Sequence, residues 1–374
     1  MMNRISTSLL FAFAFVFLVA CEPWGEDKPF VFDAPWELVD APAVGEEIRV
    51  LLYHDMEGLA GQDDPRTFSF SKPQYSEGQE MLAADINAVV DGLFAGGATV
   101  VHIVDGHGSG NPDPDLRTDL LDPRAQQVFR DEYFDAYFDL TEDDVYDAVG
   151  VVGMHAKTGS GGFASHTYTL GIDFLLNGQS ITETELVGLS WGRANVPLIF
   201  ASGDDRLEND LRTLPWIEFA QVKTATSAST ADLRPVDEAH ADMREAAKRA
   251  IENLANAKVM KVITPVRTTL RAVQPASLKL LEGVPGINYG EGSATFIAGS
   301  MQEAYDGFVA LVGVATKNYV RLLYENLSAH PSGPEIMRAY RDSLFLRWFD
   351  VESERWQPEP EETSATARRG HGYR

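Results

Sequence analysis

The 374-residue sequence contains one cysteine, Cys21, and little positive charge. A single cysteine excludes an intrachain disulfide and a cysteine-rich zinc site. Lysine and arginine number 31 against 56 aspartate and glutamate residues, so the formal net charge is −25. Because nucleic acid and anionic lipid both attract a basic face, this charge argues against nucleic-acid partners and against adsorption to membranes through a basic patch.

The sequence also lacks a conventional membrane span at its start. The apolar run from Leu9 to Ala20 is too short to span a bilayer comfortably, and Arg4 is the one charge before it. The run ends at Cys21 in a segment that resembles a bacterial lipoprotein signal, which implies that Cys21 is lipidated and becomes the N-terminus. A plain signal peptide with a chance cysteine is the alternative. We therefore expect a protein that is exported and lipid-anchored to the bacterial cell envelope, and Glu22 in place of Asp favours the outer membrane.

Composition along the chain predicts five segments. Residues 1–20 form the signal peptide, and the proline-rich, acidic residues 21–47 form a tether in which Trp24 or Trp36 can dock on the body. The polar residues 353–374 form a disordered tail. The remaining residues divide into a metal-site α/β domain at 48–205 and a second α/β part at 206–352. Together these two parts are long enough to bury a sizeable core.

Hydrophobic periodicity predicts an α/β fold. Apolar runs indicate strands at residues 48–53, 99–104, 148–152, 196–201 and 258–263. Apolar spacings of three and four indicate helices at residues 75–96, 183–193, 235–256 and 302–328. Strands that alternate with helices are typical of a largely parallel sheet flanked by helices, here with a second, smaller α/β part in the C-terminal half.

Carboxylates and imidazoles follow four of the predicted strands, in the order Asp55, Glu57, Asp105, His107, His155, His166, Asp204 and Asp205. An aspartate after a strand is by itself a common turn or helix cap, and a lone histidine is commonly structural. In parallel sheets, however, ligands bind beyond the carboxyl ends of the strands. Oxygen and nitrogen donors that recur there suit zinc, and they are more numerous than one catalytic zinc needs. The pattern favours a two-metal site.

The order of these motifs resembles the DppA-type D-aminopeptidases, a family of zinc metallopeptidases. The matching elements run through most of residues 48–325, and they are Asp55-Met56-Glu57-Gly58 with Gly61, Asp105-Gly106-His107, Gly153-Met154-His155-Ala156, Ser165-His166-Thr167, Glu183 upstream of Val196-Pro197, and Gly203-Asp204-Asp205. The start motif and the Gly-Met-His-Ala…Ser-His pair are fairly specific in combination.

The resemblance implies two zinc ions per chain and assigns their ligands. Asp55 would bridge the metals, Glu57 and His155 would complete one zinc, and His107 with Glu183 would complete the other. His166 would be the catalytic residue, as nucleophile or base. Glu185 lies two residues from Glu183 and stays an alternative ligand. Asp105, Asp204 and Asp205 are candidates for residues that brace the site.

The activity expected from the resemblance is that of a zinc-dependent aminopeptidase acting on small peptides or amides with an N-terminal D-amino acid. The resemblance also implies a homo-oligomer, and the envelope location suggests peptidoglycan-derived peptides as substrates. Another two-metal hydrolase, an amidase or a phosphoesterase, is a second reading, although no evident Arg/Lys cluster accompanies the ligands. A non-catalytic envelope binding lipoprotein is the third.

Overall fold

The computed structural model describes residues 35–109, 111, 113–128, 135–139 and 146–352, with side chains to residue 348. The predicted signal peptide, Cys21, residues 21–34 of the predicted tether and the predicted tail at 353–374 lie outside these residues. None of the helices described within these bounds combines the length and the apolar character that crossing a membrane requires.

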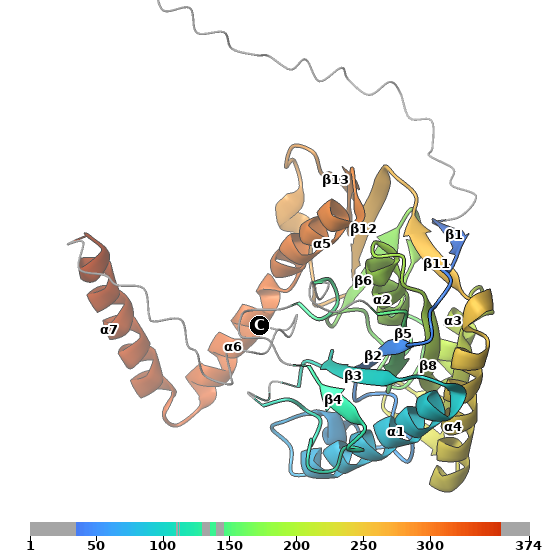
Figure 1. Cartoon of the computed structure of the whole chain (residues 1–374). Helices are drawn as coiled ribbons and strands as arrows, with labels where there is room; N and C mark the ends of the chain where they lie inside the picture. The colour runs from blue at the N-terminus through green and yellow to red at the C-terminus, as the bar shows by residue number, and fades with distance from the viewer. Residues whose placement is uncertain (1–34, 110, 112, 129–134, 140–145, 353–374) are drawn as a thin grey trace, which may run out of the picture. The chain divides into compact units, whose positions relative to one another are not determined.

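A seven-stranded sheet forms the centre of the described chain (Figure 1). All neighbouring strands are parallel except β9 and β10, which are antiparallel. In spatial order the strands are β10 (Thr230–Leu233), β9 (Glu218–Ser227), β8 (Leu198–Asp204), β5 (Ala148–Val152), β2 (Arg49–His54), β3 (Val100–Asp105) and β4 (Ala125–Gln127). This confirms the predicted fold class of a largely parallel sheet with flanking helices.

Both faces of this sheet are buried. Alternate residues of each strand point to opposite faces and therefore pack in different cores. In β2, Val50 and Leu52 pack in the core that contains residues of α1 (Tyr75–Gly96) and α4 (Val236–Glu252). Leu51 and Tyr53 pack in the other core, with residues of α2 (Glu183–Gly192). The near-continuous apolar run of β2 follows from burial on both faces.

A second, antiparallel sheet contributes to the core on the α2 side. Its spatial order is β13 (Asn288–Gly290), β14 (Ser293–Ala298), β12 (Val266–Ala272), β6 (Ile172–Leu176) and β7 (Gln179–Ser180). Helix α5 (Met301–Ala315) packs on this sheet, with Phe308 stacked on Phe174 at 3.9 Å between ring centroids. The remaining helices are η1 (Pro65–Phe68), α3 (Asp205–Asp210), η2 (Leu254–Asn256), η3 (Lys279–Leu281), α6 (Lys317–Ala329) and α7 (Gly333–Glu352).

Three features differ from the prediction. Part of the predicted tether is strand β1 (Trp36–Asp40), which pairs antiparallel with β11 (Lys258–Val262) and buries Trp36. The predicted strand at 258–263 therefore pairs with β1 in a separate two-stranded sheet. The predicted helix at 302–328 is two helices, α5 and α6. The first has Thr316 as its C-cap, and the Thr316 hydroxyl donates to the Val312 carbonyl at 2.9 Å.

The strand order of the two sheets does not test the predicted domain boundary at residue 205. Strands β9 and β10 follow this residue and extend the first sheet, on which helix α4 packs. Strands β6 and β7 precede this residue and belong to the second sheet. The division into 48–205 and 206–352 stays a prediction.

Candidate metal centre

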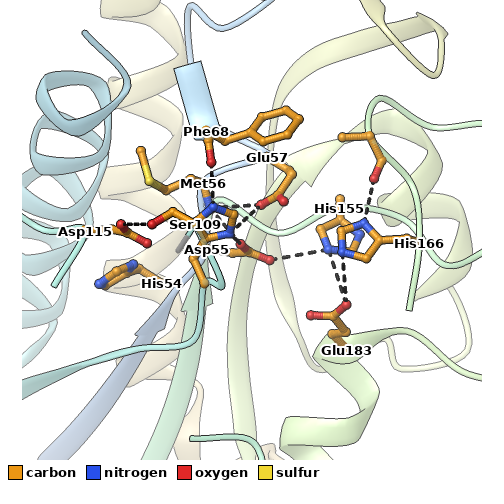
Figure 2. Close-up of polar contacts among 12 residues, drawn as sticks. His54, Asp55, Met56, Glu57, Phe68, Ser109, Asp115, His155, His166 and Glu183 are labelled. Carbon is orange, nitrogen blue, oxygen red and sulfur yellow. Dashed lines mark hydrogen bonds and ion pairs between the residues drawn. The ribbon is translucent and has the colours of Figure 1, made fainter. Parts of the chain in front are cut away.

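The predicted ligands meet at the carboxyl edge of the parallel sheet (Figure 2). Strand β2 lies between β3 and β5, so the residues that follow these three strands are neighbours in space. Glu183 joins them as the first residue of α2. The five candidate ligands are all buried: Asp55, Glu57, His107, His155 and Glu183.

Asp55 lies at the centre of the group. Its Oδ1 is 2.8 Å from Nδ1 of His107, and its Oδ2 is 3.4 Å from Nε2 of His155. Glu57 Oε2 is 3.1 Å from the same nitrogen of His107. Glu183 Oε1 is 3.5 Å from the same nitrogen of His155. Two carboxylate–imidazole groups therefore share Asp55, which is the arrangement that a bridging carboxylate requires.

Three sets of potential ligand atoms lie within 4.8 Å of one another. Two of them contain Asp55, one with Glu57 and His107 and one with His155 and Glu183; the third is Glu57, His155 and His166. Among the described residues, no such set joins His107 to Glu183. The structure thus brings the predicted ligands together but groups them differently from the predicted pairing. Which residues share which metal stays a prediction.

Backbone carbonyls orient the imidazoles of this site. His107 Nε2 is 2.8 Å from the Phe68 carbonyl, and His155 Nδ1 is 3.0 Å from the Ala156 carbonyl. A carbonyl only accepts, so each of these nitrogens carries the proton and the other ring nitrogen faces the carboxylates. Nε2 of His155 is buried and has no hydrogen-bond partner. Once deprotonated, the ring nitrogens that face the carboxylates can bind a metal, as in metal-binding histidines whose other nitrogen donates to a carbonyl, and the donor set fits a cation.

The acid–base properties of the site agree with a bound cation. Burial, together with the charge of Asp55, raises the pKa of Glu57 to about 7. Burial would also raise the pKa of Asp55, but its polar contacts with Glu57, His107 and His155 hold this pKa well below its usual range. Burial would lower the pKa of His107 and of His155, but the carboxylates raise both well above the usual value. The carboxylates therefore favour positive charge between them, which a metal ion supplies.

His166 is the neutral member of the group. Its ring stacks on His155 with 4.0 Å between centroids and a 12° interplanar angle. Burial and the charge of His155 lower the pKa of His166 to about 4, so the ring is neutral at pH 7. Its Nδ1 lies 2.8 Å from the Ala164 carbonyl, so Nε2, 3.8 Å from Glu183 Oε1, carries the lone pair. This nitrogen can accept a proton or attack a carbon.

The loop that carries His166 has an unusual backbone. Ala164 and Tyr168 both adopt positive φ, +52° and +63°, a conformation that costs on the order of 1–3 kcal/mol for a residue other than glycine. Two hydrogen bonds hold the loop in place: the Ala164 amide donates to the Ala228 carbonyl at 2.9 Å, and the Tyr168 amide donates to Glu183 Oε1 at 2.6 Å. The position of His166 is thus coupled to that of Glu183.

The geometry separates Glu183 from Glu185. Glu183 faces His155 and accepts hydrogen bonds from the Tyr137 hydroxyl and the Tyr168 amide. Glu185 is turned to the N-terminus of α2, where its Oε2 accepts a 2.7 Å bond from the Thr182 amide in a capping box. Glu185 is therefore occupied in helix capping, and Glu183 is the candidate ligand.

A pair of matched substitutions tests this assignment. We expect Glu183→Gln to weaken metal binding by about tenfold or more, since one charged ligand oxygen is lost. We expect Glu185→Gln to keep the metal, since glutamine also serves at this position of a capping box. Metal retained against a graded chelator series measures both. A loss of metal in Glu185→Gln with none in Glu183→Gln would reverse the assignment.

The three predicted bracing residues lie around the ligands and do not join them. Asp105 accepts hydrogen bonds from the amides of His107 and Asp115, at 2.9 and 2.8 Å. Asp204 caps α3 through the amide of Leu207 and also accepts from the Phe163 amide at 2.8 Å, near the His166 loop. Asp205 accepts from the Ala225 amide at 2.8 Å and belongs to none of the candidate ligand sets among the described residues.

Lys223 of β9 is a residue that the sequence analysis missed. It is fully buried, and its ammonium donates to the Glu57 carbonyl at 2.7 Å and to both the carbonyl and the side-chain oxygen of Gln62. Burial lowers its pKa to about 7. Lys223 thereby holds the loop that presents Asp55 and Glu57. No local signal reveals this, because a lysine in a strand ordinarily faces solvent.

A cavity of about 530 Å³ opens beside the ligands. Glu57, His107 and His166 are among its lining residues, and none of the lining residues that the structure describes is a lysine or an arginine. The other walls are apolar or carry hydroxyls, and include Phe68, Leu170, Ser109, Ser165 and Ser229. The volume suits a small ligand, and the walls suit an uncharged one.

Comparison with known proteins finds one family and one solved structure with these features. The peptidase M55 family, described as D-aminopeptidase, matches residues 48–310. The Zn-dependent D-aminopeptidase DppA from Bacillus subtilis, described as a self-compartmentalizing protease, superposes with a TM-score of 0.64 at 23% identity, over 72% of this chain and 98% of its own. No curated protein sequence matches. At this identity the structural likeness shows a shared fold.

Proposed function

The chain belongs to the peptidase M55 family of D-aminopeptidases, and from this membership we propose that it is a zinc-dependent enzyme that releases N-terminal D-amino acids from small peptides or amides. The observation that carries the proposal is the pair of carboxylate–imidazole groups that share Asp55 beside the neutral His166. The similar structure, DppA from Bacillus subtilis, is a Zn-dependent enzyme, and the donor set here suits that metal.

Two zinc ions per chain are proposed, with Asp55 as the shared ligand and Glu57, His107, His155 and Glu183 as the others. Bound zinc supplies Lewis acidity, which polarises a carbonyl and lowers the pKa of water. The side chains and backbone of the protein hold the ligands in position. The Phe68 and Ala156 carbonyls hold two imidazoles in the tautomer that binds metal, and Lys223 fixes the backbone of Glu57.

His166 is proposed as the residue that moves the proton or attacks the scissile carbonyl. Its Nε2 carries a lone pair at pH 7, and the ring borders the cavity. The strained loop and the bond from Tyr168 to Glu183 keep this nitrogen near the ligands. A pKa of about 4 leaves the ring unprotonated at the working pH, as both a general base and a nucleophile must be.

The substrate is proposed to be a short peptide without charged side chains. Among the residues that the structure describes, the lining of the cavity of about 530 Å³ has Glu57 as its acidic group and contains no lysine or arginine. The Glu57 carboxylate on the lining suits a positively charged amino terminus, and the lack of cations among the described lining residues is unfavourable for a phosphate ester. These walls therefore favour an aminopeptidase over a phosphoesterase.

The location and assembly of the enzyme are further parts of the proposal. Export and lipid anchoring rest on residues 1–21, where Cys21 follows a signal-like apolar run. An envelope location would bring the enzyme into contact with peptidoglycan fragments, which contain D-amino acids. A homo-oligomer is proposed because the similar structure is described as self-compartmentalizing.

Metal removal tests the proposal as a whole. We expect the purified chain from residue 22 onward to contain about two zinc ions, to release D-residues from aminoacyl amides, and to lose this activity on chelation. Readdition of zinc should restore it, because the ligands belong to a folded edge of the sheet. The L-aminoacyl amides serve as the matched control substrates. Bound metal without release of either residue would contradict the aminopeptidase assignment.

A further inference from the structure

The cavity beside the candidate metal centre is lined mostly by segments that also carry the candidate ligands or His166. The exception is the turn of the hairpin that β9 and β10 form, which contributes Ala228 and Ser229. Among the lining residues that the structure describes, these two alone follow residue 170. Neither side chain is of a kind that ligates zinc, so the size of this wall can change without a change in the metal ligands.

The turn is held in place relative to His166. The Ala164 amide donates to the Ala228 carbonyl at 2.9 Å, which ties the turn to the loop that carries His166. The hydroxyls of Ser227 and Thr230 lie 2.7 Å apart across the base of the turn. The bond from Ala164 joins backbone atoms, so a new side chain at residue 228 leaves its partners in place. A wall fixed in this way limits the size of a group that binds between it and His166.

The cavity also presents apolar side chains. Leu170 lines it and is 66% exposed, and Phe68 lines it with its ring 6.3 Å from that of His107, centroid to centroid. The volume of about 530 Å³ is in the range that holds a drug-sized ligand, which is larger than an alanyl amide. An apolar group bound against these side chains gains from leaving water, whereas a charged side chain would lose its hydration there.

We propose that the Ala228–Ser229 turn is the specificity wall of this cavity, and that the first residue of the substrate carries an apolar side chain larger than that of alanine. The small side chains of the turn leave the space that this group occupies, and Phe68 and Leu170 supply apolar contacts for it. The group in question is attached beside the carbonyl on which His166 acts, and the turn is bonded to the His166 loop. The proposal deepens, and rests on, the D-aminopeptidase activity proposed above.

The first test fills the space at the wall. Ala228→Phe is compared with wild type in the hydrolysis of D-phenylalanine amide and D-alanine amide. We expect wild type to prefer D-phenylalanine amide, and we expect the variant to lower the ratio of the two kcat/KM values about 10–200-fold, the scale on which apolar pockets discriminate. Thr224→Phe is the matched control, since Thr224 is an exposed residue of β9 outside the lining. It should keep the wild-type ratio.

The second test removes apolar surface and leaves the turn unchanged. Leu170→Ser should lower the same ratio about tenfold, and this exposed position keeps the proposal testable if Ala228→Phe fails to fold. A wild type that prefers D-alanine amide, or variants with the wild-type ratio, would overturn the proposal. So would a loss in Ala228→Phe that follows the size of the leaving amine, measured with D-alanine anilide against D-alanine amide.

Binding of free D-amino acids to the zinc-loaded protein separates this inference from the proposed activity. Calorimetry compares D-phenylalanine with D-alanine on wild type and on Ala228→Phe. If no amide is hydrolysed, but wild type binds D-phenylalanine more tightly and the variant loses this preference, the specificity wall stands and the activity fails. If all variants hydrolyse the amides with the wild-type ratio, the activity stands and the specificity wall fails. Neither hydrolysis nor binding by wild type would overturn both.

Discussion

Replacement of Asp55 by alanine is expected to abolish metal binding and activity together. Asp55 touches both imidazoles, at 2.8 Å from His107 and 3.4 Å from His155. Its loss removes an oxygen ligand from both carboxylate–imidazole groups, whereas loss of Glu57 or Glu183 affects one group. We expect kcat/KM to fall on the order of 10⁴-fold or more, the scale seen when an essential catalytic group is removed.

The measurement is metal content by elemental analysis alongside hydrolysis of a D-aminoacyl amide. Asp63→Ala is the matched control, because Asp63 is an exposed aspartate of the same loop. Circular dichroism establishes that both variants are folded. If Asp55→Ala keeps two equivalents of zinc and full activity, Asp55 is not a shared ligand and the proposed centre is wrong.

Replacement of His166 by alanine is expected to give the complementary result, in which metal is retained and turnover is lost. His166 stacks on His155 and lies 3.8 Å from Glu183, but it is not needed to complete either group around Asp55. Loss of a general base or acid typically lowers kcat by about 10²–10⁴-fold. We expect a fall of that size in kcat with zinc content unchanged.

Zinc content decides between the two roles open to this residue. His166 also belongs to a set with Glu57 and His155 that could hold a metal. If His166→Ala loses metal, His166 is a ligand; if it keeps metal and full activity, His166 has no part in the reaction. His330→Ala is the control, since His330 is exposed and lies between α6 and α7.

The sequence predicted the parallel sheet, and the candidate ligands that it indicated lie close together in the structure. Strands such as 49–54 and 100–105 have apolar runs that only burial on both faces explains, and α1 has its apolar residues at helical spacing. Carboxylates and imidazoles that follow such strands must meet at one edge of a parallel sheet. The strand order then brings His107 and His155 to either side of Asp55.

Features that depend on contacts between strands far apart in the chain could not be predicted from local sequence patterns. Strand β1 reads as an acidic, proline-flanked tether, and its pairing with β11 joins residues more than two hundred positions apart. The short strands β6, β7 and β12–β14 carry no long apolar run, because the second sheet is partly exposed. The pairing of β8 with β9 shifts register between Gly203 and Asp204, and Lys223 pairs with Asp204 just after this shift. The sequence of β9 alone does not show this pairing.

The sequence by itself determined which residue types stand at the ends of the strands, and therefore that this edge of the sheet can hold a cation. Only the tertiary structure decided how those residues share it. It turned Glu183 toward His155, and it placed the Phe68 carbonyl that sets the tautomer of His107. The physical reason is the distance along the chain over which each property is set. Strand periodicity depends on neighbouring residues. The grouping and protonation of the ligands depend on atoms that folding brings within about 3–4 Å from segments far apart in the chain.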